Sequence, residues 1–303
     1  MLNTTMAKLL PLLPERLVWI FSKRYIAGID MNDAFREARD LNDQGAMVTL
    51  DLLGEFITTM DEAEKNTRAY LDLMGALHGS GINGNLSVKP TMFGLLIDKE
   101  RCFDHIREIV QRASGYNSFI RIDMEDSACT SMEIDIFRRL KTEFPGHVGL
   151  VVQAYLKRTP DDLKSMMDLH SKEAPLNFRL CKGIYVEPAA VAFKRYEEIN
   201  AAYVENLEFM FKNKIYAAVA THDARLVDAA FDLIEQYGVP EDMVEFQMLF
   251  GVTPRLRKSI LDRGFPMRIY VPFGKDWFGY STRRLKENPA MVQHIVKALF
   301  MRG

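Results

Sequence analysis

The sequence has few cysteines, no long apolar run and almost no excess of charge. Its 303 residues include three cysteines, and the formal net charge is −2. Because Cys102, Cys129 and Cys181 lie far apart, they form neither a zinc knuckle nor a disulfide framework, and they suit a reducing compartment. A near-neutral chain also lacks the basic excess that neutralises phosphates. We therefore expect a cytoplasmic protein that binds no nucleic acid.

An apolar stretch between residues 9 and 21 is the nearest approach to a membrane segment. Two prolines, a glutamate and an arginine interrupt it, so it is too short and too broken to span a bilayer or to act as a signal peptide. Residues 16–26 mix aromatic and aliphatic side chains with three cations. This pattern favours a helix packed on the domain. The alternative is a peripheral contact with the inner face of the membrane.

Short apolar or β-branched runs recur along the chain, separated by segments with helical spacing such as 62–77 and 190–212. The runs are 47–53, 86–90, 118–123, 148–155, 178–182, 216–221, 244–249 and 267–272. Eight strands alternating with helices predict an α/β fold, a (βα)8 TIM-type barrel. Since no linker or low-complexity segment divides the chain, we expect one domain over residues 1–303. Residues 1–45 form N-terminal helices in this interpretation, and residues 46–303 form the barrel.

Polar side chains gather where the predicted strands end. They include Asp51, Lys89, Asp123, Glu125, Gln153, Arg179, Lys182, His222, Asp223, Glu245 and Gln247. Burying such groups is costly unless they pair with one another or with a ligand. Because function in these barrels lies at the carboxyl ends of the strands, the sequence predicts a site there.

The charges at this mouth leave two chemistries open. A metal-dependent hydrolase or isomerase would use Asp51, Asp123, Glu125, His222 and Glu245 as oxygen and nitrogen ligands. Against it, the cations Lys89, Arg179, Lys182, Arg283 and Arg284 would compete with a divalent ion. Guanidinium and ammonium groups suit phosphate and carboxylate ligands better. We therefore predict an anionic ligand and no metal.

Two local motifs need their context to be interpreted. Gly79 to Gly84 matches the dinucleotide pattern G-x-G-x-x-G, but it follows a predicted helix and precedes a strand, so it predicts a turn and not a Rossmann site. Arg283 and Arg284 are neighbours on a predicted helix, where side chains point about 100° apart. They reach one anion only if it lies over the helix edge, and a surface salt bridge to Glu287 is the plain alternative.

Taken in order, the strand-end motifs resemble the proline dehydrogenase family in its short, monofunctional bacterial form. They are Leu50-Asp51-Leu52-Leu53-Gly54-Glu55, Ser87-Val88-Lys89, Ile122-Asp123-Met124-Glu125-Asp126, Val152-Gln153-Ala154-Tyr155, Arg179-Leu180-Cys181-Lys182-Gly183-Ile184-Tyr185, Ala220-Thr221-His222-Asp223, Glu245-Phe246-Gln247-Met248-Leu249, and Arg268-Ile269-Tyr270-Val271-Pro272-Phe273-Gly274 followed by Tyr280 and Arg283-Arg284-Leu285. The resemblance implies a distorted barrel that carries FAD, with the last helix over the strand ends.

The implied activity is the oxidation of L-proline to Δ1-pyrroline-5-carboxylate, the first step of proline catabolism. Hydride passes to FAD, and the electrons pass on to a quinone-type acceptor. We expect the downstream pyrroline-5-carboxylate dehydrogenase to be a separate chain. A non-catalytic binding protein that has kept the barrel and lost the chemistry is a further alternative.

The resemblance also assigns residues to roles. For substrate binding and catalysis it implies Lys89, Asp123, Leu249, Tyr270, Tyr280, Arg283 and Arg284, with Glu55 as a gate partner of Arg283. For FAD it implies Asp123, Gln153, Arg179, Lys182, Gly183, Tyr185, Thr221, His222, Gln247, Arg284 and Glu287. Cys181 and Ile184 stand where the family motif has valine and alanine. The bulkier Ile184 is predicted to crowd the substrate or the flavin edge.

Overall fold

The computed structural model describes residues 18–19, 22–54 and 57–281. A helix, α3 (Met31–Asp43), precedes the first strand. The strands are β1 (Met47–Leu52), β2 (Gly84–Val88), β3 (Ile120–Ile122), β4 (Val148–Gln153), β5 (Asn177–Cys181), β6 (Tyr216–Ala220), β7 (Val244–Leu249) and β8 (Met267–Phe273). The helices between them are α4 (Met60–Gly79), α5 (Lys99–Gly115), α6 (Thr130–Glu143), α7 (Thr159–Ser165), α8 (Tyr196–Lys212), α9 (Ala224–Tyr237) and α10 (Pro254–Leu261).

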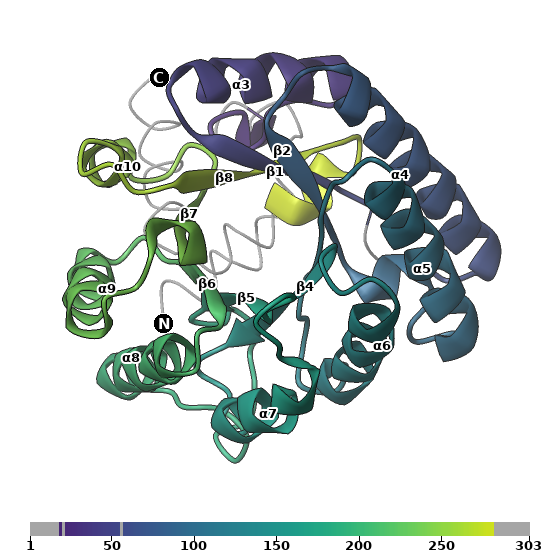
Figure 1. Cartoon of the computed structure of the whole chain (residues 1–303). Helices are drawn as coiled ribbons and strands as arrows, with labels where there is room; N and C mark the ends of the chain where they lie inside the picture. Colours follow the sequence, from purple (N-terminus) through teal and green to yellow (C-terminus); the bar gives the residue numbers. More distant parts are fainter. Residues whose placement is uncertain (1–17, 20–21, 55–56, 282–303) are drawn as a thin grey trace, which may run out of the picture.

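The eight strands close into one parallel barrel in chain order. Closure comes from β1 and β8, which pair in parallel from Met47 opposite Arg268 to Leu52 opposite Phe273. Figure 1 shows the helices forming a ring around the strands. The predicted (βα)8 barrel is confirmed, and each predicted strand overlaps an observed one.

Alternation along the strands explains why the barrel has an apolar outer face and a polar interior. On β1, Val48 and Leu50 are fully buried within the main hydrophobic core. The intervening Thr49 and Asp51 are also buried, but they bond to side chains from β2 and from the residue after it. Successive side chains of a strand point to opposite faces. One set therefore packs against the helices, and the other fills the barrel with hydrogen-bonding groups.

One predicted helix begins later than expected. The segment 190–212 has helical spacing throughout, yet α8 starts only at Tyr196. The preceding residues pair instead with the segment after β4: Phe193 N–H donates to Tyr155 O at 2.8 Å, and Ala192 bridges to Leu156. The helical prediction was therefore wrong for residues 190–195, because these backbone bonds to a distant segment outcompete the local helical pattern.

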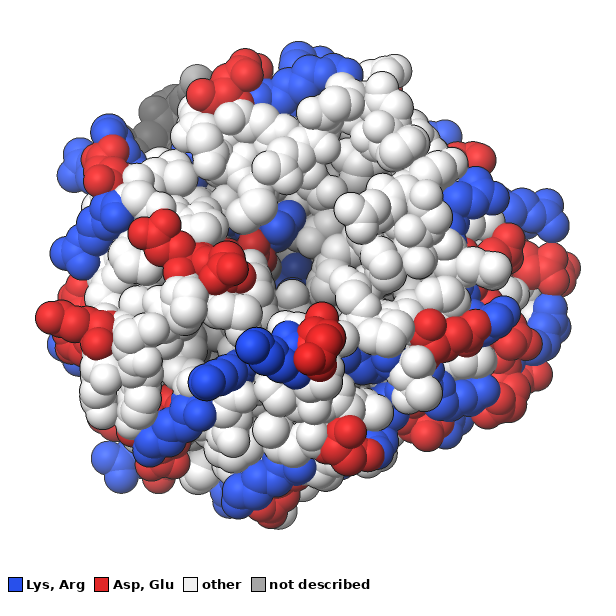
Figure 2. Space-filling model, in the orientation of Figure 1, with Lys and Arg blue, Asp and Glu red and all other residues white. Residues whose placement is uncertain are grey.

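The glycine motif between α4 and β2 is a turn, as predicted. Helix α4 ends at Gly79 and strand β2 begins at Gly84, and Gly81 between them has a φ of 72°. Within the described part of the chain, no helix is long and apolar enough to cross a membrane. Figure 2 shows basic and acidic side chains spread together around the rim of the barrel, which is hollowed at its centre.

Candidate active site

A cavity of about 540 Å³ lies at the carboxyl ends of the strands. Every predicted substrate or cofactor residue within the described ranges lines it. These are Lys89, Asp123, Gln153, Arg179, Lys182, Gly183, Tyr185, Thr221, His222, Gln247, Leu249, Tyr270 and Tyr280. Glu55, Arg283, Arg284 and Glu287, which were also predicted, lie outside the described residues. The barrel thus brings together groups that are far apart in the sequence.

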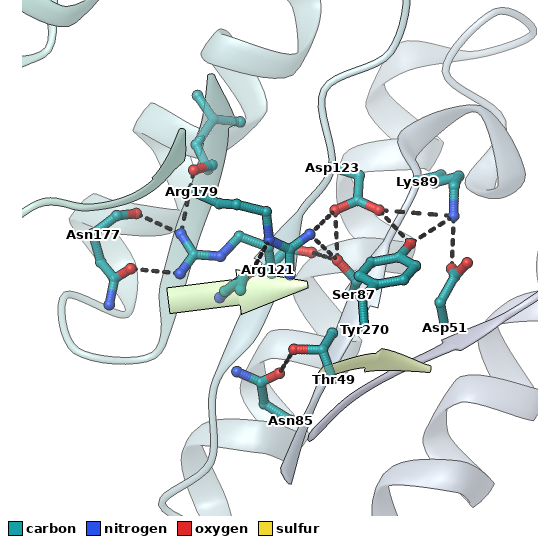
Figure 3. Close-up of polar contacts among 12 residues, drawn as sticks. Thr49, Asp51, Asn85, Ser87, Lys89, Arg121, Asp123, Asn177, Arg179 and Tyr270 are labelled. Carbon is teal, nitrogen blue, oxygen red and sulfur yellow. Dashed lines mark hydrogen bonds and ion pairs between the residues drawn. The ribbon is translucent and has the colours of Figure 1, made fainter. Parts of the chain in front are cut away.

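Asp123, just after β3, is the hub of the buried polar groups in the cavity floor (Figure 3). Its Oδ1 accepts hydrogen bonds from Ser87 Oγ at 2.5 Å and Arg179 Nη1 at 2.7 Å. Its Oδ2 accepts one from the Tyr270 hydroxyl at 2.8 Å and lies 3.7 Å from Lys89 Nζ. The donors come from β2, β5, β8 and the residue after β2, so they meet only because the barrel is closed.

These donors decide the charge of Asp123. Burial alone would raise the pKa of this carboxyl, but the charges of Arg179 and Lys89, with hydrogen bonds from Ser87 and Tyr270, lower the pKa below its usual range. Burial, together with the carboxylates Asp123 and Asp51, raises the pKa of the Tyr270 phenol well above its usual range. Asp123 is therefore a carboxylate and Tyr270 a neutral donor. A carboxylate held this firmly is a poor proton acceptor.

Arg179 on β5 is fixed on two sides and has one donor to spare. Its Nε donates to Gln247 Oε1 at 2.5 Å and its Nη1 to Asp123. Its Nη2 is buried and finds no hydrogen-bond partner among the residues the structure describes. A buried guanidinium nitrogen without a partner is expensive. Arg179 also lines the cavity, so a ligand bound there would lie beside a guanidinium whose Nη2 no described residue engages.

The loop after β5 combines a cation with a close approach of the backbone. Lys182 Nζ lies 2.7 Å from Asp223 Oδ2 and 4.4 Å from the centroid of the Tyr196 ring. Gly183 has a φ of 103°, and a Cβ on it would lie 2.1 Å from the Tyr155 ring. Only glycine fits this conformation and this space. The Tyr155 ring thereby fixes the backbone of Gly183 where this residue joins the cavity wall.

Two further cavity residues are held in defined orientations. His222 Nε2 accepts the backbone N–H of Leu249 at 2.9 Å, so in the neutral ring the proton sits on Nδ1. Gln153 donates through Nε2 to the carbonyl of Glu125 at 2.7 Å, which leaves its Oε1 as the acceptor end of the amide. Both orientations follow from bonds to backbone groups and are therefore set before any ligand binds.

The residues considered as metal ligands are paired in separate places. Asp51 Oδ1 lies 2.6 Å from Lys89 Nζ, Glu245 Oε1 lies 2.9 Å from Arg268 Nε, and Glu125 accepts from Thr91. No group of three or more His, Cys, Asp or Glu side chains is gathered as a metal site requires within residues 18–19, 22–54 and 57–281. The acids are thus arranged around lysine and arginine, and an anionic ligand at this cavity stays a prediction.

Sequence reasoning did not single out Ser87, although it lies in a quoted motif. It is fully buried, and its hydroxyl touches both Asp123 and Arg179. The signal that could have found it was the alternation Asn85, Ser87, Lys89 on one face of a strand that is otherwise apolar. Ile184 and Cys181, the two departures from the family motif, both line the cavity. Ile184 is 43% exposed, and its effect on ligand fit stays a prediction.

The fold and the site together define a class: a (βα)8-barrel enzyme with a cationic cavity at its carboxyl-terminal face. Comparisons with known proteins identify the family within this class. A model of the proline dehydrogenase family matches residues 34–297. Proline dehydrogenase 2 of Bacillus subtilis (strain 168) is 34% identical over 276 residues, covering 91% of this chain and 89% of that protein. Proline dehydrogenase 1 of the same strain is 35% identical over 280 residues, covering 92% of this chain and 90% of its own length.

A proline dehydrogenase of Deinococcus radiodurans is 33% identical over 291 residues, covering 95% of this chain and 92% of that protein. Among solved structures, proline utilization A (PutA) of Bdellovibrio bacteriovorus, inactivated by N-propargylglycine, matches with a TM-score of 0.83 and 26% identity. The match covers 89% of this chain and 33% of the PutA chain. This chain belongs to the proline dehydrogenase family. Its members are oxidoreductases, typically flavin-dependent, that convert proline to Δ1-pyrroline-5-carboxylate.

Proposed function

We propose that this chain oxidises L-proline with FAD bound in the cavity at the carboxyl ends of the strands. The observation that carries the proposal is the spare donor of Arg179. Its Nη2 is buried without a partner among the described residues and belongs to a side chain that lines the cavity. FAD held in this cavity would supply the acceptor for the hydride from C5 of proline. A fixed positive donor stabilises the negative charge that develops on the acceptor during that transfer.

The loop after β5 supports the pyrophosphate end of FAD. Lys182 supplies a positive charge, and Gly183, whose backbone packs against the Tyr155 ring, brings the main chain to the cavity wall. Gln153, Tyr185, Thr221, His222 and Gln247 contribute polar groups to the same wall. The donor set suits a ligand with two phosphates and a polar ring system, as FAD is.

Lys89, Asp123, Leu249, Tyr270 and Tyr280 form the part of the cavity that we assign to proline. Proline is a zwitterion, and its ring nitrogen must lose a proton before C5 gives up a hydride. The cations Lys89 and Arg179 nearby lower the pKa of that ammonium group. Since Asp123 is already committed to Ser87, Arg179 and Tyr270, we assign the proton to water.

Arg283 and Arg284 are assigned to the proline carboxylate on the family resemblance alone, as are the gate role of Glu55 and the flavin contacts of Arg284 and Glu287. Arg284→Met tests this assignment. Losing one charged hydrogen-bond partner costs about 2–3 kcal/mol, so KM for proline should rise by roughly 30- to 200-fold while the fold persists. Unchanged proline kinetics would remove Arg284 from the site.

The family resemblance implies a quinone-type acceptor for the electrons, and we assign it to the inner face of the membrane. The segment 16–26 is the candidate contact. Among its described residues Val18 and Ile26 are buried, so we assign the contact to the exposed cations Lys23 and Arg24. The product is the substrate of a pyrroline-5-carboxylate dehydrogenase. We also take residues 1–303 as one domain.

An anaerobic titration with proline, followed by flavin absorbance, tests the proposal. We expect a yellow protein whose visible flavin band is bleached in proportion to the proline added. A yellow protein that proline does not bleach would point to another secondary amine or to a binding protein. A colourless protein that contains a divalent metal would favour the metal-dependent alternative.

A further inference from the structure

A chain of buried polar contacts runs from the opposite end of the barrel to Arg179. It starts at Arg268 on β8, which lines a second cavity of about 360 Å³ near the amino ends of β2, β3 and β4. Arg268 Nε lies 2.9 and 3.1 Å from the two carboxylate oxygens of Glu245. Glu245 accepts a hydrogen bond from the amide nitrogen of Gln247. Gln247 in turn accepts from Arg179 Nε.

The side-chain amide of Gln247 has only one orientation that satisfies both of its neighbours. A carboxylate accepts hydrogen bonds and cannot donate them, so Glu245 requires the NH2 end of the Gln247 amide. Arginine Nε donates and cannot accept, so Arg179 requires the carbonyl end. One orientation of the amide meets both requirements in this structure. Glu245 and Gln247 lie two residues apart on β7, so their side chains share one face of the strand. Reversing the amide would set acceptor against acceptor at one end and donor against donor at the other.

Glu245 fixes the orientation of the Gln247 amide only while its carboxyl group is ionised. It is 2% exposed, and burial alone would raise its pKa, but the charge and hydrogen bonds of Arg268, with a further hydrogen bond from Gln247, lower the pKa below the usual range. Arg268 keeps its own charge, since Glu245 outweighs burial and raises the pKa of the guanidinium. The pair is therefore charged on both sides, and the orientation of Gln247 is constant across the physiological pH range.

We propose that the Glu245–Arg268 ion pair is a positioning device, which fixes the Gln247 amide and thereby aims the spare nitrogen of Arg179 into the flavin site. The inference rests on the proposed function. Neither Glu245 nor Arg268 lines the flavin cavity. They act through Gln247 and Arg179, and they are not catalytic residues.

Glu245→Gln tests the proposal, because glutamine has nearly the shape of glutamate without the charge. In either orientation the new amide sets its NH2 group against a donor: at the position of Oε2 it faces Arg268 Nε, and at the position of Oε1 it faces both Arg268 Nε and the NH2 group of Gln247. The charge and the acceptor that fix the direction of the Gln247 amide are thereby weakened. We expect the dissociation constant of FAD to rise about tenfold. The potential of the bound flavin should shift about 30 mV more negative, the equivalent of tenfold for a two-electron couple.

Arg268→Lys distinguishes an effect on the position of Gln247 from an effect on the stability of the fold. Lysine keeps Glu245 ionised but loses the bond that Arg268 donates to the carbonyl of Val48. This variant should melt at a lower temperature and keep the wild-type flavin potential. Glu133→Gln, at another buried glutamate that does not line the cavity, is the matched control and should leave the potential unchanged.

Three results would overturn the inference. One is a Glu245→Gln holoprotein with wild-type FAD affinity and potential. Another is an equal shift of the potential in Glu245→Gln and Arg268→Lys, since a general loss of stability would then explain both. If Glu245→Gln alone does not fold, the double variant Glu245→Gln/Arg268→Met removes both buried charges, and a wild-type potential in it would also refute the idea. A wild-type protein that binds no FAD instead refutes the proposed function.

Discussion

Arg179 Nη1 and Asp123 Oδ1 lie 2.7 Å apart in the interior of the barrel, both largely shielded from water. Asp123 follows β3 and Arg179 lies on β5. These two strands are not neighbours in the barrel, so the ion pair crosses its interior. The contact leaves Arg179 with one spare nitrogen and Asp123 with little basicity. It links the stability of the barrel to the chemistry of the cavity, because a change in either partner leaves the other charge buried.

Replacing Asp123 by Asn should therefore lower stability and ligand binding together. Removing one partner of a buried ion pair costs on the order of 3–5 kcal/mol, because the remaining charge loses its compensation. We expect a lower urea midpoint, and a fall in FAD retained after gel filtration and in kcat/KM. Asp168→Asn is the matched control: this carboxylate also pairs with an arginine, Arg138, but it is 58% exposed. That variant should match wild type within about 1 kcal/mol, and equal behaviour of the two variants would contradict the prediction.

Tyr270→Phe should make the folded protein more sensitive to acid. The Tyr270 hydroxyl donates to Asp123 Oδ2 at 2.8 Å and accepts from Lys89 Nζ at 3.1 Å. Without this donor the carboxylate is less stabilised, so the pKa of Asp123 rises and protonation begins at a higher pH. The stability that the ionised carboxylate contributes is then lost at a higher pH on acidification, and melting temperatures measured at decreasing pH should fall earlier in the variant than in wild type. Tyr203→Phe removes another buried hydroxyl, which donates to the carbonyl of Leu180 at 2.9 Å, and should leave the pH dependence of melting unchanged.

The barrel could be predicted because its strands carry their own signal. Each has an apolar set that packs against the helices, and turns or helices separate it from the next. The types of residue at the site were predictable too, since lysine, arginine and aspartate at strand ends are costly without partners. Particular pairings were not. Whether Asp123 meets Arg179 or Lys182 depends on strand register and on closure between β1 and β8, which connect distant parts of the sequence.

Gln247 illustrates a second limit of the sequence. Glutamine is more often exposed than buried, and nothing local shows that Glu245 and Arg179 lie at the two ends of this amide. Ser87 was missed although the alternation of Asn85, Ser87 and Lys89 marks one polar face of β2. The predicted start of α8 was wrong for a different reason: residues 190–195 have helical spacing, but their backbone bonds to the segment after β4. Local pattern predicts an element, and contacts between distant segments decide where it begins.

Glu133→Gln should flatten the dependence of stability on pH. Glu133 is fully buried, and burial followed by the charge of Glu125 raises the pKa of its carboxyl well above the usual range. The folded protein thus holds a proton that the unfolded chain releases above a pH of about 4.3. Stability from this group is complete below that pH and is lost as the pH rises toward the folded pKa. Glutamine has no proton to lose, and its oxygen still accepts the Glu125 N–H that Glu133 Oε1 accepts. Melting curves at pH 5 and pH 8 should show a larger loss in wild type, and parallel losses would refute the assignment.

Gly183→Ala should release the flavin while leaving most of the barrel intact. A left-handed backbone costs a residue with a side chain about 1–2 kcal/mol, and the new methyl group would lie 2.1 Å from the Tyr155 ring. The loop must shift to relieve this contact, and it carries Lys182 and Tyr185 with it. Gly79→Ala is the matched control, since this glycine ends α4 and nothing lies within 4 Å of an added Cβ. It should be neutral or stabilising by up to about 1 kcal/mol. The measurements are the ratio of FAD to protein after gel filtration and the urea midpoint. A Gly183→Ala protein that keeps its full complement of FAD would show that the bare backbone at 183 is not part of the cofactor site.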